Sequence, residues 1–351
     1  MSQFHTLTIK EIQRETEQSV VIGFNVPQDL KPVFQFKAGQ YITLKAMVEG
    51  KEVRRDYSIC SSPKSGELKV AIKAVKDGYF SSFANKKLEI GDAIDVASPN
   101  GRFVFEPNDA NARTVAAFAA GSGITPIMSI AKTVMEEEPK SNFVLVYGNK
   151  TPKDTIFLSE LLQLQSQYND RFRIHFVYSQ SQENDALFGR IETSTINFIL
   201  KNNYKDTNID RFYICGPEPM IHNVKDVLLE FGVKEPQILF ELFTVTTPAA
   251  PIDESLIDGK TKVTILLDDE ETSFVMDQKK SVLEAALAED LDAPYSCQGG
   301  ICSSCLARLT EGKVTMRQNN ILTDSELAEG LILTCQAHPT TPIIRVDYDD
   351  I

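Results

Sequence analysis

The 351-residue sequence has little imidazole to offer a metal ion, because it contains only four histidines. These are His5, His175, His222 and His338, and they lie too far apart in the chain to form the spaced ligand set of a metal site. We therefore expect that the chain does not activate molecular oxygen itself.

Long apolar runs are absent as well. No stretch approaches the ~18 apolar residues that cross a bilayer. The N-terminal string MSQFHTLTIKEIQRE alternates like a strand and lacks the order of basic, apolar and small residues that marks a secretory signal. We expect a cytoplasmic protein without membrane contact, in which thiols stay reduced and clustered cysteines hold metal more often than they form disulfides.

Positive charge is in deficit, with 36 Lys and Arg against 49 Asp and Glu, a net charge of −13 and an isoelectric point near 4.9. Such a chain repels nucleic acid, which we exclude as a partner. Residues 261–351 hold 16 acidic and 7 basic side chains, so −9 of the net charge lies in the last quarter. This acidic segment is either an ordinary solvated surface or a docking face for a basic protein partner.

The hydrophobic pattern changes along the chain and predicts several domains. Residues 1–106 contain short alternating segments separated by Gly, Pro and Asp, which is typical of an antiparallel β-barrel or sandwich. In residues 107–243, continuous apolar strands alternate with helical stretches, which indicates an open α/β sheet with parallel strands. Residues 244–260 lack periodicity and read as a linker, and residues 261–351 begin with a hairpin pattern and a short helix.

Three cysteines fall within nine positions in SCQGGICSSCLARL. They are Cys297, Cys302 and Cys305, and Cys335 follows after 29 further residues. This C-x4-C-x2-C spacing with a distant fourth cysteine is that of a plant-type [2Fe-2S] cluster, and Gly299 and Gly300 would let the backbone approach inorganic sulfide. A structural zinc site prefers C-x2-C pairs on both sides, and a disulfide framework needs an oxidising compartment. The spacing therefore favours iron and sulfide, and these residues resemble a plant-type ferredoxin, which implies a β-grasp fold.

A one-electron centre cannot take a hydride, so a flavin should precede it. In RRDYSICSSP, the guanidinium of Arg55 could bind a pyrophosphate, the ring of Tyr57 could cover an isoalloxazine, and the hydroxyl of Ser58 could reach the flavin N5. Such a string is also ordinary in a barrel strand. The string KDGYFSSF adds a predicted helix start suited to phosphate, with candidate residues Gly78, Phe80, Ser81 and Ser82.

A dinucleotide site is predicted where TVAAFAAGSGITPIMSI runs from a strand into a helix. The candidates are Gly121, Ser122, Gly123, Thr125 and Pro126, and the last should occupy the first helical position, where proline is tolerated. The G-x-G-x-x-G fingerprint of dinucleotide-binding turns is incomplete here, because Pro126 stands in place of its final glycine. A second strand ends in the candidates Cys215, Gly216 and Pro217, and the string FELF ends the domain with Glu241 and Phe243. Cys215 could instead be a buried strand thiol, as we expect for Cys60.

In this order, the motifs Arg-x-Tyr-Ser, Gly-x-x-Ser, GSGITP, CGP and Glu-x-Phe resemble the ferredoxin-NADP reductase superfamily. The resemblance implies that Arg55 and Ser81 bind the FAD pyrophosphate, that Tyr57 stacks on the ring and that Ser58 bonds to N5. Lys73 would follow the ribityl chain through its main chain. Thr125 and the glycine turn would hold NADPH or NADH. Cys215 would face the nicotinamide, with Glu241 and Phe243 bordering the flavin.

The whole chain resembles three-domain reductases with a C-terminal ferredoxin, and strings such as FHTLT, RRDYSIC, AAGSGITP and LVYGN resemble the reductase subunits of phenylacetyl-CoA epoxidases. The resemblance implies hydride transfer from NAD(P)H to FAD and single-electron transfer through the cluster to an oxygenase. Another hydroxylase or a cytochrome P450 could be the acceptor, and a redox sensor or electron store is the alternative of another class. Ser179-Gln180 stands where a Ser-Arg pair often marks NADPH use, but Lys150 could replace the arginine, so neither nucleotide is excluded.

Overall fold

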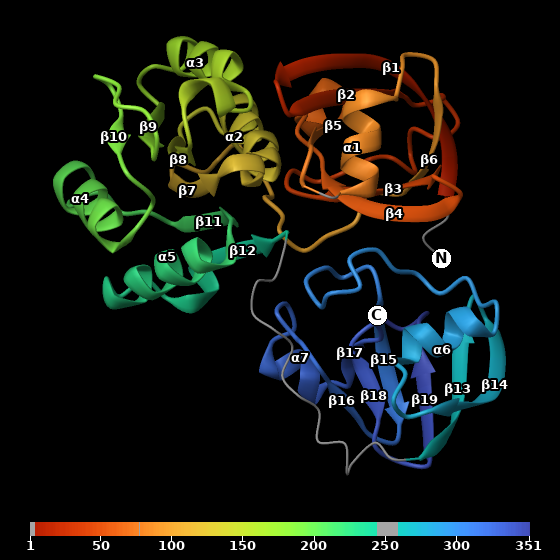
Figure 1. Ribbon diagram of the computed structural model, residues 1–351. Coiled ribbons are helices and arrows are strands. Elements are labelled where there is room, and N and C mark those ends of the chain that lie inside the picture. Colours follow the sequence, from red (N-terminus) through yellow and green to blue (C-terminus); the bar gives the residue numbers. More distant parts are fainter. Residues whose placement is uncertain (1–3, 77, 244–258) are drawn as a thin grey trace. The chain divides into compact units, whose positions relative to one another are not determined.

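The computed structural model describes residues 4–76, 78–243 and 259–351 (Figure 1). The chain divides after Phe243 into two compact units, so that residues 4–243 form one unit and the described residues 259–351 belong to the other. We call these the reductase unit and the ferredoxin unit. Most of the predicted linker, residues 244–258, lies outside the described residues. Among the described residues no helix is long and apolar enough to cross a membrane.

The first part of the reductase unit is an antiparallel sheet closed into a barrel. Alternating residues such as Val20, Ile22 and Phe24 point into one core, as the sequence pattern predicted. A bridge between Ile59 and Val70 joins the two edge strands. The sheet order is β4-β3-β6-β1-β2-β5, with β1 (Phe4–Thr16), β2 (Ser19–Asn25), β3 (Tyr41–Val48), β4 (Lys51–Ser58), β5 (Leu68–Lys73) and β6 (Ala93–Ala97). Helix α1 (Tyr79–Lys86) packs Phe80 and Ala84 into the barrel core.

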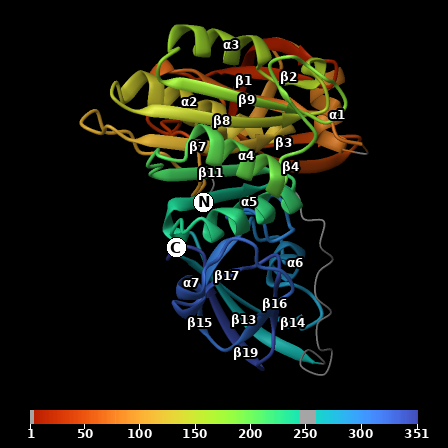
Figure 2. The ribbon, with the colours of Figure 1, turned by 90° about the vertical axis from the view of Figure 1, so that its left-hand side faces the viewer.

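The second part is a fully parallel sheet covered by helices on both faces. The strand order is β10-β9-β8-β7-β11-β12, with β7 (Thr114–Ala120), β8 (Asn142–Asn149), β9 (Phe172–Tyr178), β10 (Leu187–Phe188), β11 (Arg211–Gly216) and β12 (Ile238–Leu242). The helices are α2 (Ile124–Glu137), α3 (Leu158–Gln167), α4 (Thr193–Asn203) and α5 (Glu218–Glu230). Figures 1 and 2 show α2 and α3 on one side of the sheet and α4 and α5 on the other. The strand order reverses between β7 and β11, and ligands of open α/β sheets bind at that switch point.

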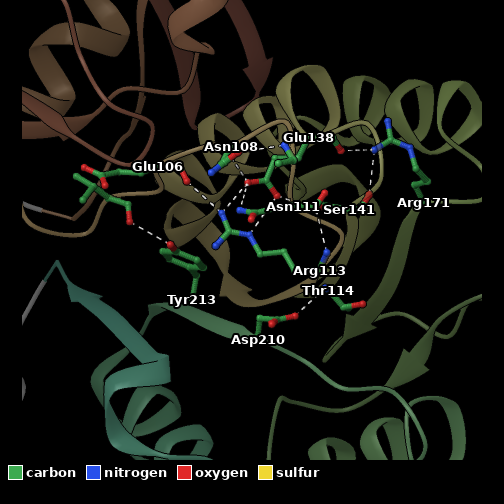
Figure 3. Close-up of polar contacts among 12 residues, drawn as sticks. Glu106, Asn108, Asn111, Arg113, Thr114, Glu138, Ser141, Arg171, Asp210 and Tyr213 are labelled. Atoms are coloured by element: carbon green, nitrogen blue, oxygen red, sulfur yellow. Dashed lines mark hydrogen bonds and ion pairs between the residues drawn. The ribbon is translucent and has the colours of Figure 1, made fainter.

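A buried polar network fixes the segment that joins the barrel to the parallel sheet (Figure 3). The carboxylate of Glu138 is fully buried and pairs with Arg113 at 2.7 Å. It also accepts hydrogen bonds from the backbone of Asn108 and the side chain of Asn111. Arg113 in turn donates to the carbonyl of Glu106 at the end of the barrel. Although burial opposes ionisation, these donors hold the pKa of Glu138 below its ordinary value.

The ferredoxin unit has a five-stranded sheet of order β14-β13-β19-β15-β17, in which β13 and β19 are parallel and the other neighbours antiparallel. Its elements are β13 (Lys260–Leu267), β14 (Glu270–Asp277), α6 (Val282–Ala288), β15 (Leu306–Glu311), β16 (Val314–Met316), α7 (Asp324–Ala328), β17 (Leu331–Leu333), β18 (Ala337–Pro339) and β19 (Ile343–Asp347). The predicted hairpin and short helix are therefore confirmed. Helix α6 begins in a capping box, in which Ser281 and Glu284 bond to each other's backbone amides.

Candidate functional site

Strand β4 carries the three residues of the predicted flavin motif. Because side chains alternate along a strand, Arg55 and Tyr57 point to the same side, opposite Ser58. Arg55 is exposed and donates to the carbonyl of Arg54 at 2.7 Å. The Tyr57 ring is partly buried and lies 5.6 Å from the Phe80 ring. Burial raises the pKa of Tyr57, so its hydroxyl stays neutral and its ring face remains an apolar surface for a flat ligand.

Helix α1 begins at Tyr79 with Gly78 as its N-cap, close to the start that the sequence predicted. A Cβ at Gly78 would lie 2.3 Å from Ser81 Oγ and 2.5 Å from Val75 Cγ2, so a larger residue would displace these side chains. Ser81 is buried and its hydroxyl accepts a hydrogen bond from the Val75 amide. Phe80 is 1% exposed and belongs to the barrel core. Ser82 is only partly buried, and its amide already donates to the Gly78 carbonyl at 3.0 Å, so the amides that could meet a phosphate are those of the residues before it.

The glycine turn after β7 is a short 3-10 helix, Gly121–Gly123, that leads directly into α2. Gly121 has φ +55°, and a Cβ at Gly123 would lie 2.1 Å from the carbonyl oxygen of Cys215. The Thr125 hydroxyl donates to the Ser122 carbonyl at 3.0 Å. Pro126 is the third residue of α2 and not the first, as we had predicted. This position is tolerated because the first four amides of a helix have no intrahelical acceptor.

Strand β11 delivers Cys215 and Gly216 to the same edge of the sheet, beside the glycine turn. Cys215 is fully buried, which raises the pKa of its thiol. A Cβ at Gly216 would lie 2.7 Å from Met220 Cε and 3.2 Å from Ala120, so the neighbouring strand ends approach closely. Pro217 precedes α5 as its N-cap. The parallel register places Cys215 opposite Glu241 of β12, on one face of the sheet.

The barrel and the parallel sheet meet where Ser58 donates to Glu241, with 3.2 Å between Ser58 Oγ and Glu241 Oε2. Burial raises the pKa of Glu241 to about 8, although the Ser58 hydroxyl lowers it and Asp56 raises it further. The carboxyl is therefore neutral at pH 7. Phe243 follows β12 and packs, partly buried, against the core that surrounds α2. A predicted flavin residue and a predicted nicotinamide residue are thus in direct contact.

Lys73 ends β5, and its side chain reaches the glycine turn. Its Nζ lies 3.7 Å from the position that a Cβ on Gly121 would take. Burial lowers the pKa of Lys73; nearby Asp154 opposes this shift, and Lys150 adds to it. The sequence indicated a main-chain role and a solvated side chain. The structure places the ammonium group beside the glycine turn, half-buried, and the main-chain role stays a prediction.

These features fit both organic cofactors. The barrel offers an exposed guanidinium, a flat aromatic face and a glycine-capped helix start, which suit a pyrophosphate and an isoalloxazine. The sheet offers a glycine turn that has no room for a side chain at Gly123, beside a cysteine and a largely neutral carboxyl near its switch point. We propose that the predicted residues bind FAD and the nicotinamide nucleotide in these two places.

The four predicted cluster cysteines lie in two pairs in the ferredoxin unit. The thiol of Cys302 lies 3.1 Å from Cys297 Sγ and lowers the pKa of Cys297 to about 6, and three backbone amides act in the same direction. The side chains of Cys305 and Cys335 contact each other, and Thr334 ties the two together by donating to the Cys305 carbonyl at 2.9 Å. All six cysteines are described and none forms a disulfide.

Two pairs of thiols suit two irons better than one metal ion. In a [2Fe-2S] cluster, each tetrahedral iron binds two bridging sulfides and therefore needs two thiolates. Within the described ranges, no three His, Cys, Asp or Glu side chains converge on a single ion, as a structural zinc site requires. Gly299 donates to Cys297 Sγ at 3.3 Å, so the loop already directs backbone amides at sulfur. The residues fit the cluster, and we propose the four cysteines as its ligands.

Two residues of these sites escaped the sequence analysis. Tyr147 is fully buried in β8, and its hydroxyl donates to the Gly121 carbonyl at 3.0 Å. Gln336 directly follows Cys335 and donates to the Gln298 carbonyl at 2.8 Å. Each is a polar side chain in an otherwise apolar string, which was the available signal. Each supports a loop that carries the predicted chemistry.

Comparison with protein families gives three matches in the predicted order. Residues 6–105 match the oxidoreductase FAD-binding domain, residues 118–226 the oxidoreductase NAD-binding domain and residues 265–340 the 2Fe-2S iron-sulfur cluster binding domain. The protein is therefore an oxidoreductase with FAD, NAD and [2Fe-2S] domains, and the predicted fold class and cofactor classes are confirmed. The choice between NADH and NADPH is not tested by these matches.

Similar proteins of known role cover nearly the whole chain. It is 37% identical over 354 residues to a subunit of the 1,2-phenylacetyl-CoA epoxidase of Escherichia coli, with 99% of both chains covered. It is 32% identical over 357 residues to the ferredoxin reductase component of 3-ketosteroid-9-alpha-monooxygenase of Mycobacterium tuberculosis, covering 98% and 96%. The glycine betaine monooxygenase reductase subunit of Pseudomonas aeruginosa is 28% identical, covering 98% and 95%. All three are parts of oxygenase systems.

Solved structures share the fold. Phthalate dioxygenase reductase superposes with a TM-score of 0.60 at 24% identity, covering 98% of both chains. An intact type IV self-sufficient cytochrome P450 monooxygenase superposes with a TM-score of 0.72 at 20% identity. The match covers 98% of the present chain and 41% of that chain. At these identities, the two structures support the three-domain fold alone.

Proposed function

Since the chain belongs to the family of oxygenase reductases that join FAD-binding, NAD-binding and 2Fe-2S domains, we propose that it transfers electrons from NAD(P)H to an oxygenase component. The observation that carries this proposal is the contact between Ser58 and Glu241. These residues are 183 positions apart, and their hydrogen bond brings the flavin motif to the end of the nicotinamide domain. Electron transfer between two cofactors requires this juxtaposition, because hydride moves only between rings held at reactive distance.

FAD accepts a hydride and releases electrons singly, and a [2Fe-2S] cluster carries one electron at a time. The chain's own residues bind, orient and protect these groups. Arg55 and the start of α1 would hold the pyrophosphate of FAD, and Tyr57 would cover one face of its ring. The glycine turn, Thr125 and Lys73 would hold the dinucleotide. These assignments are supported by residue chemistry and by their placement at two neighbouring edges of one compact unit.

Ser58, Cys215 and Glu241 are the proposed catalytic residues. With a pKa near 8, Glu241 holds a proton at neutral pH and adds no negative charge to a site that must receive a hydride. Its oxygen Oε2 lies within reach of the Ser58 hydroxyl, so the pair can orient a proton toward the flavin edge. Cys215 is buried opposite Glu241 and would form an apolar, neutral wall beside the nicotinamide.

We further propose that the acceptor is a phenylacetyl-CoA epoxidase. The support is the 37% identity across the full length to a component of that enzyme from Escherichia coli. The steroid and glycine betaine relatives favour a second candidate, the reductase of another oxygenase. The net charge of −9 on residues 261–351 supports a basic docking face on the partner. We also propose a cytoplasmic location, where thiols stay reduced and can hold iron.

Anaerobic titration of the purified holoprotein with NADPH, and separately with NADH, tests the electron path. We expect one nucleotide to bleach the flavin absorbance and to generate the rhombic paramagnetic resonance signal of a reduced [2Fe-2S] cluster. The better donor is the physiological one. If neither nucleotide reduces the flavin while dithionite still reduces the cluster, the protein is a carrier or sensor and the proposal fails.

The acceptor is tested by adding the oxygenase component of the Escherichia coli epoxidase and following nucleotide oxidation. We expect oxidation to require phenylacetyl-CoA and to slow as salt rises, because salt screens the attraction between an acidic and a basic face. Oxidation that responds to a 3-ketosteroid with the corresponding steroid monooxygenase, and not to phenylacetyl-CoA, would favour the second candidate. A rate independent of salt would contradict the basic face.

A further inference from the structure

A buried glutamine connects the two ends of the cysteine cluster. Gln336 is 8% exposed and directly follows Cys335. Its amide nitrogen donates to the Gln298 carbonyl at 2.8 Å and lies 3.7 Å from Cys335 Sγ, within hydrogen-bonding distance for sulfur. One amide group therefore touches both the loop after Cys297 and the last of the four cysteines.

The same side chain packs under the turn of that loop. Gln298 has φ +52°, a left-handed conformation that is unfavourable for a residue with a Cβ. Gly300 has φ +69°, and a Cβ there would lie 3.1 Å from Gln336 Cγ and 2.9 Å from the Gln318 carbonyl. The loop between α6 and β15 has no regular hydrogen-bonded structure. A strained turn of this kind persists only where surrounding contacts hold it, and the hydrogen bond from Gln336 to the Gln298 carbonyl is one of them.

The second contact of the amide has a separate consequence. A buried amide must be hydrogen-bonded, and the Gln298 carbonyl satisfies one of its two N–H groups. The other N–H is available to Cys335 Sγ. Hydrogen bonds to the sulfur ligands of an iron-sulfur cluster stabilise its reduced form, which carries more negative charge, and so raise its reduction potential.

We propose that Gln336 is a positioning residue for the iron-sulfur site. Its amide anchors the loop at Gln298 and raises the cluster's reduction potential through Cys335 Sγ. The inference rests on the proposed four-cysteine cluster. In this proposal, Gln336 is not a ligand of the cluster but makes the cluster a better electron acceptor.

The decisive variant is Gln336→Met, which keeps the length of the side chain and removes the donor. Gln278→Met is the matched control. Gln278 is equally buried in the same unit, but its amide donates to Thr261 Oγ1 at 2.9 Å and makes no contact with a cysteine. Gln336→Glu is the second variant, because it keeps the shape and places an acceptor against the sulfur.

The readouts are the cluster's midpoint potential and the g-values of its reduced signal, measured in the full-length holoprotein. For Gln336→Met, we expect the equilibrium between the oxidised and reduced cluster to move about three- to tenfold toward the oxidised form. This corresponds to a potential about 30 to 60 mV more negative for a one-electron couple. Gln336→Glu should make the cluster potential still more negative, and Gln278→Met should leave it unchanged. The flavin potential should be the same in all variants.

Two results would overturn the inference. One is a Gln336→Met protein that retains a full cluster and has the wild-type midpoint potential of that cluster. The other is an equal shift in Gln278→Met, which would indicate a general effect of loosening the unit. Loss of the cluster from both Gln336 variants, with full iron in Gln278→Met, would support the anchoring role. Iron and sulfide analysis of the wild type comes first, because absence of a cluster there would refute the proposed function and not the role of Gln336 alone.

Discussion

The two units of this chain build their sites in opposite ways. In the reductase unit, Ser58 and Glu241 are 183 positions apart, and strand ends in two different sheets bring them to hydrogen-bonding distance. In the ferredoxin unit, three of the four cysteines fall within nine positions, on a loop without regular structure. The first site therefore depends on the packing of a large core. The second depends on its cofactor and on a few side chains that hold the loop.

The comparison predicts that the two halves of the electron path can be separated. Cys302 is a proposed ligand, so Cys302→Ala would remove one of the two thiolates proposed for one iron. We expect the cluster to be lost and transfer to an oxygenase to be abolished. Flavin reduction by NAD(P)H should continue at the wild-type rate, because the reductase unit keeps its own core. Iron analysis and stopped-flow absorbance measure the two effects.

The control for this variant is Cys60→Ala, which removes a thiol that is buried in the reductase unit and donates to the Lys69 carbonyl. It should retain a full complement of iron. A Cys302→Ala protein with an intact cluster would contradict the ligand assignment. Slow flavin reduction in that variant would show that the units are not independent.

The units should also unfold separately, and the polar network at Glu138 gives the sharpest test. Arg113→Met leaves the fully buried Glu138 carboxylate without its ion-pair partner. Breaking a buried pair from one side costs about 3 kcal/mol, so the unfolding transition of the reductase unit should move to clearly lower temperature. Calorimetry should show an unchanged ferredoxin transition.

Arg345→Met is the matched control in the other unit. Arg345 pairs with Glu271 at 2.6 Å, but both side chains are exposed. An exposed pair contributes about 0 to 1 kcal/mol, so this variant should change little. Equal destabilisation by the two substitutions would mean that burial of the network is not what stabilises the reductase unit.

The reductase site should respond to pH through Glu241, whose pKa burial raises to about 8 from an ordinary value of 4.5. At pH 6 the carboxyl is almost entirely neutral. As the pH rises through 8 it ionises and places a negative charge beside the flavin, so we expect flavin reduction to slow by about tenfold. Stopped-flow measurements from pH 6 to 9.5 give the profile, and Glu241→Gln should flatten it.

Stability is linked to the same group. The neutral buried carboxyl stabilises the folded state fully below about pH 4.5, and this contribution is lost as the pH rises from 4.5 through 8. The unfolding free energy of the reductase unit should therefore fall over that range, and less so in Glu241→Gln. A wild-type rate profile without a step near pH 8 would contradict the assignment of Glu241 to the site.

The contrast between the units also explains what the sequence could predict. Local spacing was sufficient to predict that Cys297 and Cys302 lie close together, because both stand on one short loop. Their role as ligands stays a proposal. Alternation and apolar runs were sufficient for the barrel and the parallel sheet. The contact between Ser58 and Glu241 could not be derived, because each residue gives only a weak motif and the distance between them depends on how two sheets pack.

Supporting side chains were the least predictable. Arg113 and Glu138 look like ordinary surface charges in the sequence, and only the fold shows that they meet in a buried network. The predicted helical position of Pro126 was wrong by two residues. The glycine turn is itself a 3-10 helix, so α2 begins directly after it at Ile124, which the sequence motif does not reveal. Gln336 stands beside a functional loop without belonging to any motif. Tyr147 lies in the string LVYGN, which gave the resemblance but no role for this residue.

The smallest expected effect concerns Tyr147, whose hydroxyl lies 3.0 Å from the Gly121 carbonyl oxygen and 3.3 Å from that of Ile156. Its single proton is shared between these two acceptors and supports the glycine turn. Tyr147→Phe removes these bonds and keeps the ring in the core, which should cost about 1 kcal/mol. Because the turn would bind the dinucleotide, the loss should appear as a Kd for NAD(P)H raised about fivefold, with little change in the rate of flavin reduction at saturation.

Tyr213→Phe is the control, since Tyr213 is also buried and donates to the Val104 carbonyl away from the turn. If both variants weaken nucleotide binding equally, the effect belongs to the core and not to the turn. If Tyr147→Phe alone weakens it, the glycine turn depends on a single buried hydroxyl, as we infer that the cluster loop depends on one amide.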